Sequence, residues 1–135
     1  MTPFAGVCLD TDVCIDLLRG TRRLEHISFA DLPSSALWVS AITVAELEYG
    51  VRRSRTPDRE SARLTRLLEF VAIRAFDSRA AGVAGTVRAH LEQGGARIGA
   101  LDALIGGHAL AEGAALLTRN VREFSRIPGL VVAEL

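Results

Sequence analysis

The residues of this chain that are best suited to chemistry are three carboxylates. Asp10 directly follows the apolar run 7–9, Glu46 lies within the apolar stretch 41–51, and Asp102 lies in the first turn of an expected helix. A charged carboxylate in apolar surroundings needs a cation or hydrogen-bond donors to offset its loss of water. Three such oxygen ligands suit a hard cation, so the sequence indicates a site for Mg²⁺, for which Mn²⁺ would substitute.

Two of these carboxylates also have an ordinary structural explanation. Asp10 can cap the N-terminus of a helix, although Thr11 or Asp12 is the better cap by register, which leaves Asp10 without a structural task. Asp102 can simply stabilise the positive end of a helix dipole. The sequence leaves both explanations open beside the catalytic one.

Helical geometry distinguishes Glu46 from its neighbours. At about 100° per residue it shares a face with Ile42 and Tyr49, whereas Glu48 points nearly to the opposite side. Glu46 is therefore the carboxylate on a partly apolar face, and we expect a metal ion or an arginine as its partner.

Missing residue types exclude several classes of enzyme. All sixteen basic residues are arginine, which excludes P-loop NTPases and Schiff-base enzymes in their usual form. Cys8 and Cys14 are too few for a disulfide framework or a zinc set. The chain also has no Ser-His-Asp order and no Cys-His pair for nucleophilic catalysis. Metal-activated water is the nucleophile that such a chain can best supply, and hydrolysis of phosphodiesters is the expected reaction class.

Strands and helices are expected to alternate along the chain. Strand-like apolar segments lie at 6–9, 38–40, 71–73, 115–118 and 130–133, and the expected helices cover about 13–20, 40–54, 58–70, 77–92, 100–112 and 121–124. This alternation predicts an α/β fold with a small parallel sheet and helices on both sides. Ligands of such sheets bind outside the carboxyl ends of the strands, where Asp10 is expected.

Length and composition point to one ordinary globular unit. With 135 residues, 49% of them hydrophobic, the chain is expected to form a single domain over residues 1–135. No apolar run approaches the roughly 20 residues needed to span a bilayer, and no basic stretch precedes an apolar one at the N-terminus. We therefore expect a cytoplasmic protein without a membrane segment.

Four blocks of sequence, in their order and spacing, resemble the PIN-domain ribonucleases, specifically the VapC toxins. The blocks are LDTDV at 9–13, VSAITVAELEYGV at 39–51, LDALIGGHA at 101–109 and LTRNVREF at 117–124, followed by IPGL at 127–130. The resemblance covers essentially the whole chain. It implies a three-layer α/β/α PIN-like sandwich and a Mg²⁺-dependent endoribonuclease that is inhibited by a cognate VapB-like antitoxin.

The resemblance also implies roles for individual residues. Asp10 and Asp102 correspond to direct metal ligands, and Glu46 to an acid that binds metal or orients water. The residues expected to support the pocket are Thr11, Asp12, Ser40, Thr118 and Asn120. Two of them depart from the family pattern, which usually has Asn at the position of Asp12 and often an acid at that of Asn120. Either Asp12 restores the missing charge, or Asn120 acts as a neutral ligand.

Three arginines are candidates for contacts with RNA. Arg59, Arg63 and Arg66 share a helix face that can hold RNA phosphates, or can be a solvated face paired with Glu60 and Glu69. Because aromatic residues are few, structured RNA such as tRNA fits better than a long stacked single strand. A homodimer is expected from the resemblance.

Two other functions remain as alternatives. Asp10 and Asp12 are two residues apart, as in the haloacid-dehalogenase-like phosphatases, but these usually also need a lysine. A non-catalytic PIN module that binds only RNA or an antitoxin is the second alternative, and Asn120 favours it slightly.

Overall fold

The computed structural model describes residues 6–23 and 36–134 and shows a five-stranded sheet in which all neighbouring strands are parallel. The strands are β1 (Val7–Leu9), β2 (Leu37–Ser40), β3 (Ala72–Arg74), β4 (Ala115–Thr118) and β5 (Val132–Glu134), in the order β3-β2-β1-β4-β5. The central strands β1, β2 and β4 are completely buried, as is usual for a parallel sheet covered on both faces.

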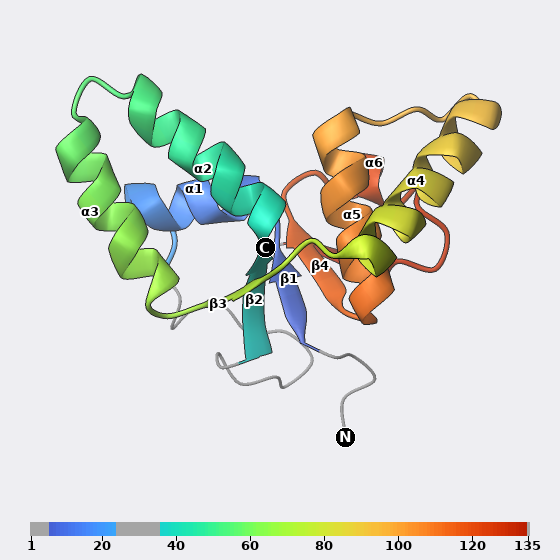
Figure 1. Ribbon diagram of the computed structural model, residues 1–135, viewed down its shortest axis with the longest axis horizontal. Helices are drawn as coiled ribbons and strands as arrows, with labels where there is room; N and C mark the ends of the chain where they lie inside the picture. The colour runs from blue at the N-terminus through green and yellow to red at the C-terminus, as the bar shows by residue number, and fades with distance from the viewer. Residues whose placement is uncertain (1–5, 24–35, 135) are drawn as a thin grey trace.

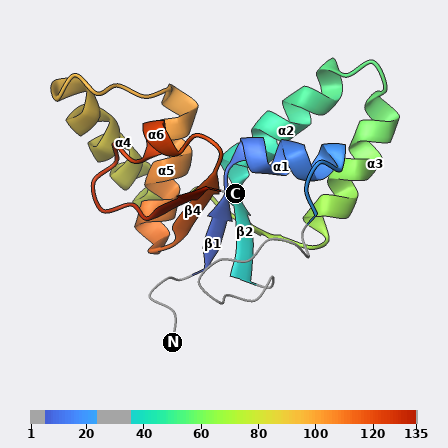
Figure 2. The ribbon, with the colours of Figure 1, turned by 180° about the vertical axis from the view of Figure 1, so that it is seen from behind.

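Helices cover the sheet on both sides. They are α1 (Thr11–Arg19), α2 (Ala41–Arg53), α3 (Pro57–Leu68), α4 (Ser78–Gln93), α5 (Ala100–Glu112) and α6 (Val121–Phe124). Figures 1 and 2 show α1, α2 and α3 on one side of the sheet and α4, α5 and α6 on the other. The prediction of an α/β/α sandwich with a small parallel sheet is confirmed.

Two hydrophobic cores result from the alternation of side chains along each strand. Val7, Val39 and Leu117 pack with the helices α1 to α3, whereas Cys8 and Leu116 point the other way and pack with α4 to α6. Cys8 and Cys14 are buried free thiols, one in each core, as small apolar residues would be.

The start of α1 differs from the sequence prediction. Asp10, rather than Thr11 or Asp12, is the N-cap residue, and its carboxylate accepts a hydrogen bond of 2.8 Å from the Thr11 backbone N–H. The prediction was wrong because it assigned the cap from the apolar residues that follow, whereas β1 ends at Leu9 and the helix begins without a linker. As expected, Gly20 ends the helix, with a φ of 76° that favours glycine.

No helix in the described part of the chain is long and apolar enough to cross a membrane.

Candidate active site

Asp10 lies at the carboxyl end of β1, between that strand and the end of β4. Its backbone N–H donates to the Leu117 carbonyl, and the Thr118 hydroxyl donates to its Oδ2 at 2.7 Å. The side chain is only 4% exposed. The parallel pairing of β1 and β4 therefore joins two residues that are 108 positions apart in the sequence.

Asp12 faces the same region from the first turn of α1. Its Oδ2 accepts the Arg119 backbone N–H at 3.1 Å and lies 3.4 Å from the Thr118 hydroxyl oxygen. Its Oδ1 is buried and has no hydrogen-bond partner among the described residues. Thr118 also accepts the Asn120 N–H at 2.9 Å, so this hydroxyl organises the turn that follows β4.

Glu46 is held on α2 by a hydroxyl from α1. The Thr11 hydroxyl lies 2.7 Å from Glu46 Oε1 and 3.1 Å from the Thr43 hydroxyl. A hydroxyl has one proton, and the shorter contact to the charged oxygen is the stronger use of it. Thr11 thus links the carboxylate of α2 to the helix that begins at Asp10.

Asp102 lies in the first turn of α5 and is surrounded by negative charge. Burial raises its pKa to about 6, and the charges of Glu123, Glu46 and Asp12 act in the same direction. Burial also raises the pKa of Asp10 to about 7. The Thr118 hydrogen bond lowers this pKa again, while the nearby charges of Asp12 and Asp102 raise it. Raised pKa values in neighbouring acids are typical of a site that lacks its cation.

Glu123 is an acid of this site that the sequence analysis missed. Its Oε1 accepts the Gly99 N–H at 2.9 Å, and the Asn120 side-chain amide donates to its Oε2 at 2.6 Å. These hydrogen bonds lower the pKa of Glu123, so it stays charged beside Asp102. One sequence signal could have indicated Glu123 as a site residue. It lies three residues after Asn120 and hence on the same side of α6.

Arg119 is the cation that pairs with Asp12. Its Nε lies 3.3 Å from Asp16 Oδ2 and 3.9 Å from Asp12 Oδ2, and the side chain is half exposed. Asp16 is also paired with Arg22, whose Nε lies 3.3 Å away. One guanidinium therefore partly offsets the charge of Asp12, but Asp102 and Glu123 form no ion pair with another described residue.

The chemistry of these acids fits a divalent cation. The orphaned Oδ1 of Asp12 and the raised pKa values of Asp10 and Asp102 indicate carboxylates without enough positive charge around them. Among the described residues, no three histidine, cysteine or acidic side chains are gathered closely enough to enclose an ion as they stand. Ligation of an ion by these carboxylates would therefore require their side chains to rearrange.

Ser40 lies behind the carboxylates rather than among them. Its hydroxyl accepts the Ile42 N–H at 3.1 Å as the N-cap of α2 and lies 2.8 Å from Nδ1 of His108, which is completely buried. The contact between Ser40 and His108 joins the start of α2 to α5. Ser40 thus supports the two helices that hold Glu46 and Asp102.

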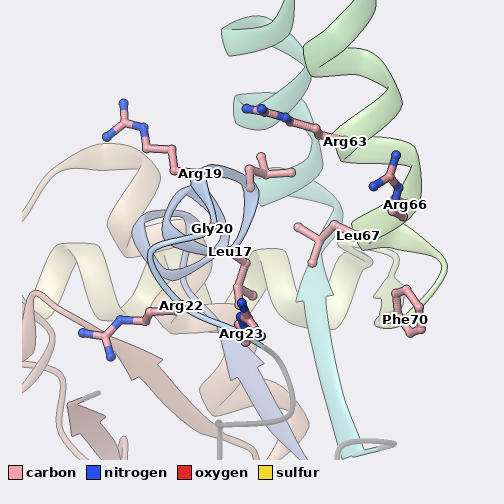
Figure 3. Close-up of a pocket in the computed structure, with 10 residues that line it drawn as sticks. Leu17, Arg19, Gly20, Arg22, Arg23, Arg63, Arg66, Leu67 and Phe70 are labelled. Atoms are coloured by element: carbon pink, nitrogen blue, oxygen red, sulfur yellow. The ribbon is translucent and has the colours of Figure 1, made fainter.

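Two of the three candidate RNA-binding arginines line a pocket elsewhere on the molecule. Arg63 and Arg66 of α3 lie opposite Arg19, at the end of α1, around a pocket of about 640 Å³ with Leu67 at its wall (Figure 3). Arg59 is exposed and does not line it. Arg63 pairs with Glu60 at 3.2 Å, as the solvated-face alternative expected. The pocket is at the opposite end of α1 from the acidic site.

Comparisons with known proteins agree with this site. The PIN domain family model matches residues 7–130. The tRNA(fMet)-specific endonuclease VapC of Salmonella typhimurium is 35% identical over 127 residues, which are 93% of this chain and 95% of the relative. Ribonuclease VapC2 of Rickettsia felis is 34% identical over 125 residues, or 92% and 93% of the two chains.

Solved structures agree in the same way. The VapC-type chain in the DNA-bound VapBC structure of Salmonella typhimurium superposes with a TM-score of 0.89 at 33% identity, covering 97% of this chain and 98% of the other. A structure of VapBC2 from Rickettsia felis bound to promoter DNA gives a TM-score of 0.83 at 30% identity, with 96% of this chain and 98% of the other covered.

These matches decide against a haloacid-dehalogenase-like phosphatase. PIN-domain nucleases generally depend on divalent metal ions, which the acidic cluster around Asp10 suits. The chain therefore belongs to the PIN-domain family of VapC ribonucleases.

Proposed function

We propose that this protein is a Mg²⁺-dependent endoribonuclease and the toxin of a type II toxin–antitoxin pair. The observation that carries the proposal is the pair of carboxylates Asp10 and Asp102 near the carboxyl end of β1, whose pKa values are raised by burial and by the negative charges around them. Mn²⁺ would substitute for Mg²⁺, since both prefer oxygen ligands.

Asp10 and Asp102 would hold the ion, with Glu46 and Glu123 beside them. A bound divalent ion polarises a phosphodiester and makes water more acidic. Thr118 fixes Asp10 and Thr11 fixes Glu46, so these two carboxylates keep their orientation without the ion. Glu46, which the Thr11 hydroxyl holds beside Asp10, would be the acid that accepts a proton from an attacking water. Asp12 and Asn120 would not bind the ion directly. Asp12 adds negative charge near it, and the Asn120 amide holds Glu123 in place.

Structured RNA such as tRNA is the proposed substrate, and a VapB-like antitoxin is the proposed inhibitor. Support comes from the Salmonella typhimurium relative, whose name specifies tRNA(fMet), and from the VapBC complexes among the structural neighbours. Arg59, Arg63 and Arg66 remain proposed phosphate contacts for parts of the RNA that reach beyond the acidic site.

Cleavage of RNA by the purified protein tests the proposal. Bulk tRNA incubated with the protein and Mg²⁺ is expected to give discrete fragments, and EDTA should abolish them. Asp102→Asn, purified in the same way, controls for a contaminating nuclease. Equal cleavage by this variant, or cleavage that continues in EDTA, would contradict the assignment.

A homodimer is the proposed assembly. The protomer has a mass of 14.5 kDa, and five large hydrophobic side chains are exposed in the described part of the chain. Some of this apolar surface is expected to be covered by a second copy. Light scattering at micromolar concentration should give twice the protomer mass, and a monomer would overturn the proposal.

A further inference from the structure

Tyr49 and Arg53 form an exposed pair on α2 that no part of the site described above uses. Tyr49 is 63% exposed, although aromatic residues are few in this chain. Arg53 Nη1 donates to the Tyr49 hydroxyl at 2.9 Å, and the guanidinium carbon lies 5.7 Å from the ring centroid. The pair thus presents one free aromatic face beside a positive charge that is already oriented.

The pair continues the face of α2 that carries Glu46. Tyr49 and Arg53 follow Glu46 by three and seven residues, so they lie about 4.5 and 10 Å further along the helix and within about 60° of it. Leu47 and Val51 face the core, which leaves this face of the helix toward solvent. Glu46 itself is joined to Asp10 through Thr11, whose hydroxyl donates to Glu46 Oε1 at 2.7 Å and whose N–H donates to Asp10 Oδ1 at 2.8 Å. A strand of RNA at the acidic site can therefore reach the pair.

Charge pairing distinguishes Arg53 from its neighbour. Arg52 lies on another side of α2 and pairs with Glu48 at 3.8 Å. Arg53 hydrogen-bonds to Tyr49 and forms no ion pair with another described residue, so its charge is not offset by a paired carboxylate. The favourable position of a cation in the last turn of a helix explains either arginine, but it does not explain the exposed ring beside one of them.

We propose that Tyr49 and Arg53 form a nucleotide subsite next to the scissile phosphate, a role that rests on the proposed ribonuclease function. One base stacks on the Tyr49 ring, and the Arg53 guanidinium binds a neighbouring phosphate. The acidic cluster repels the RNA backbone, so a cation beside it is needed to hold the flanking phosphates. A single ring holds a single base, which agrees with a chain that has few aromatic residues. The subsite would select RNA in which one nucleotide beside the cleavage point is unstacked.

Binding of a fluorescein-labelled RNA stem-loop, measured by fluorescence anisotropy, tests this subsite. Asp102→Asn serves as the background of every variant so that the RNA is not cleaved. Tyr49→Ala is expected to weaken binding about tenfold, and Tyr49→Phe much less, because it keeps the stacking face. Arg53→Gln should reduce the slope of log Kd against log salt concentration by about one phosphate contact. Arg52→Gln is the matched control, with the same loss of charge, and should change the slope less.

An RNA series with single abasic positions identifies the stacked base. At one position, removal of the base should weaken binding to the Tyr49-containing protein but have little further effect in the Tyr49→Ala variant. Equal affinity of Tyr49→Ala and its parent, or equal slopes for the two arginine variants, overturns the subsite while RNA cleavage by the wild type still supports the proposed function. A wild-type protein that neither binds nor cleaves RNA overturns both.

Discussion

Each acidic residue of the site has a different structural support, and these supports explain which of them can be exchanged. Asp10 caps a helix and accepts the Thr118 hydroxyl, Glu46 accepts Thr11, and Glu123 accepts the Gly99 N–H. The Asp102 carboxylate accepts no hydrogen bond from another described residue, so it is the least fixed of the four. We therefore expect Asp102 to adjust most easily when a cation is bound.

The first prediction concerns Asp10→Asn and Asp102→Asn. Each variant removes one ligand charge at nearly constant volume, so RNA cleavage should fall at least about a hundredfold. The fold should remain intact, since Asn caps a helix about as well as Asp. Loss of repulsion in the metal-free protein should raise Tm by about 3 °C. Cleavage assays and thermal unfolding in EDTA measure the two effects. Full activity in both variants would remove these residues from the metal site.

The second prediction concerns Asn120 and Glu123, which share a hydrogen bond of 2.6 Å. Glu123→Gln should weaken Mg²⁺ binding about tenfold or more, measured by calorimetry, because it removes the charge beside Asp102. Asn120→Asp places two carboxylates in contact, so it should lower Tm without metal and bring a larger gain in Tm on adding Mg²⁺.

Asp12→Asn is the matched comparison for these two variants. If Asp12 supplies the missing charge, its loss weakens Mg²⁺ binding as much as Glu123→Gln does. The structure favours Glu123, because Asp12 already has Arg119 at 3.9 Å. An unchanged affinity in Glu123→Gln with a large loss in Asp12→Asn would contradict this view.

The helix pair α4 and α5 decides where Asp102 stands, because α5 packs closely against its neighbour. A Cβ at Gly107 would lie 2.5 Å from the Cα of Ala84, so the backbones of the two helices are in contact there. On the other side of α5, a Cβ at Gly106 would meet Ile127 and Phe124. Two consecutive glycines thus fit one helix between a second helix and the turn after α6.

The third prediction follows from this contact. Gly107→Ala should destabilise the protein by about 3 kcal/mol, since the backbone of α4 cannot move aside cheaply. Gly85→Ala is the matched control, because a Cβ there meets nothing within 4 Å. It should stabilise the protein by about 0.5–1 kcal/mol, as expected for alanine in place of glycine inside a helix. Urea unfolding of both variants measures the difference. Equal stability would show that the contact can relax.

Most elements of this fold could be predicted from the sequence, because their signals are local. Gly20 and Gly113 end helices as their positions suggested, and apolar runs mark the strands. The N-cap at Asp10 could not be assigned this way, since it depends on where β1 ends in the sheet. The same holds for Glu123, whose role depends on a contact with Gly99 across 24 residues. Local patterns indicated Asp10, Glu46 and Asp102 but not Glu123, whose place depends on tertiary packing.

Across the whole molecule, opposite charges are separated although the net charge is zero. Acids gather near the carboxyl ends of β1 and β4, whereas five arginines and no acid are found among the described residues that line the pocket between α1 and α3 (Figure 3). The two regions lie at opposite ends of α1, so the pocket arginines do not lie beside Asp10 and Asp102. The acidic end is therefore costly for the metal-free fold at neutral pH.

The last prediction is a dependence of stability on pH that divalent metal removes. The pKa values of Asp10, about 7, and Asp102, about 6, lie above the ordinary value of 3.8. The folded protein therefore binds more protons than the unfolded chain between about pH 4 and pH 7, and its free energy of unfolding falls as the pH rises through this range. In EDTA, wild type should lose on the order of 2 kcal/mol more between pH 5 and pH 8 than the double variant Asp10→Asn/Asp102→Asn.

Adding Mg²⁺ should restore this stability at pH 8 but hardly at pH 5, because protons compete with the ion for the same oxygens. At a concentration of one hundred times Kd the gain is about 2.7 kcal/mol. The double variant should show little of it, which distinguishes binding at the acidic site from a general salt effect. Urea unfolding at the two pH values, with and without Mg²⁺, gives all the differences. Parallel pH profiles for wild type and the double variant would mean that Asp10 and Asp102 titrate as ordinary surface acids. The two carboxylates would then not destabilise the metal-free protein at neutral pH.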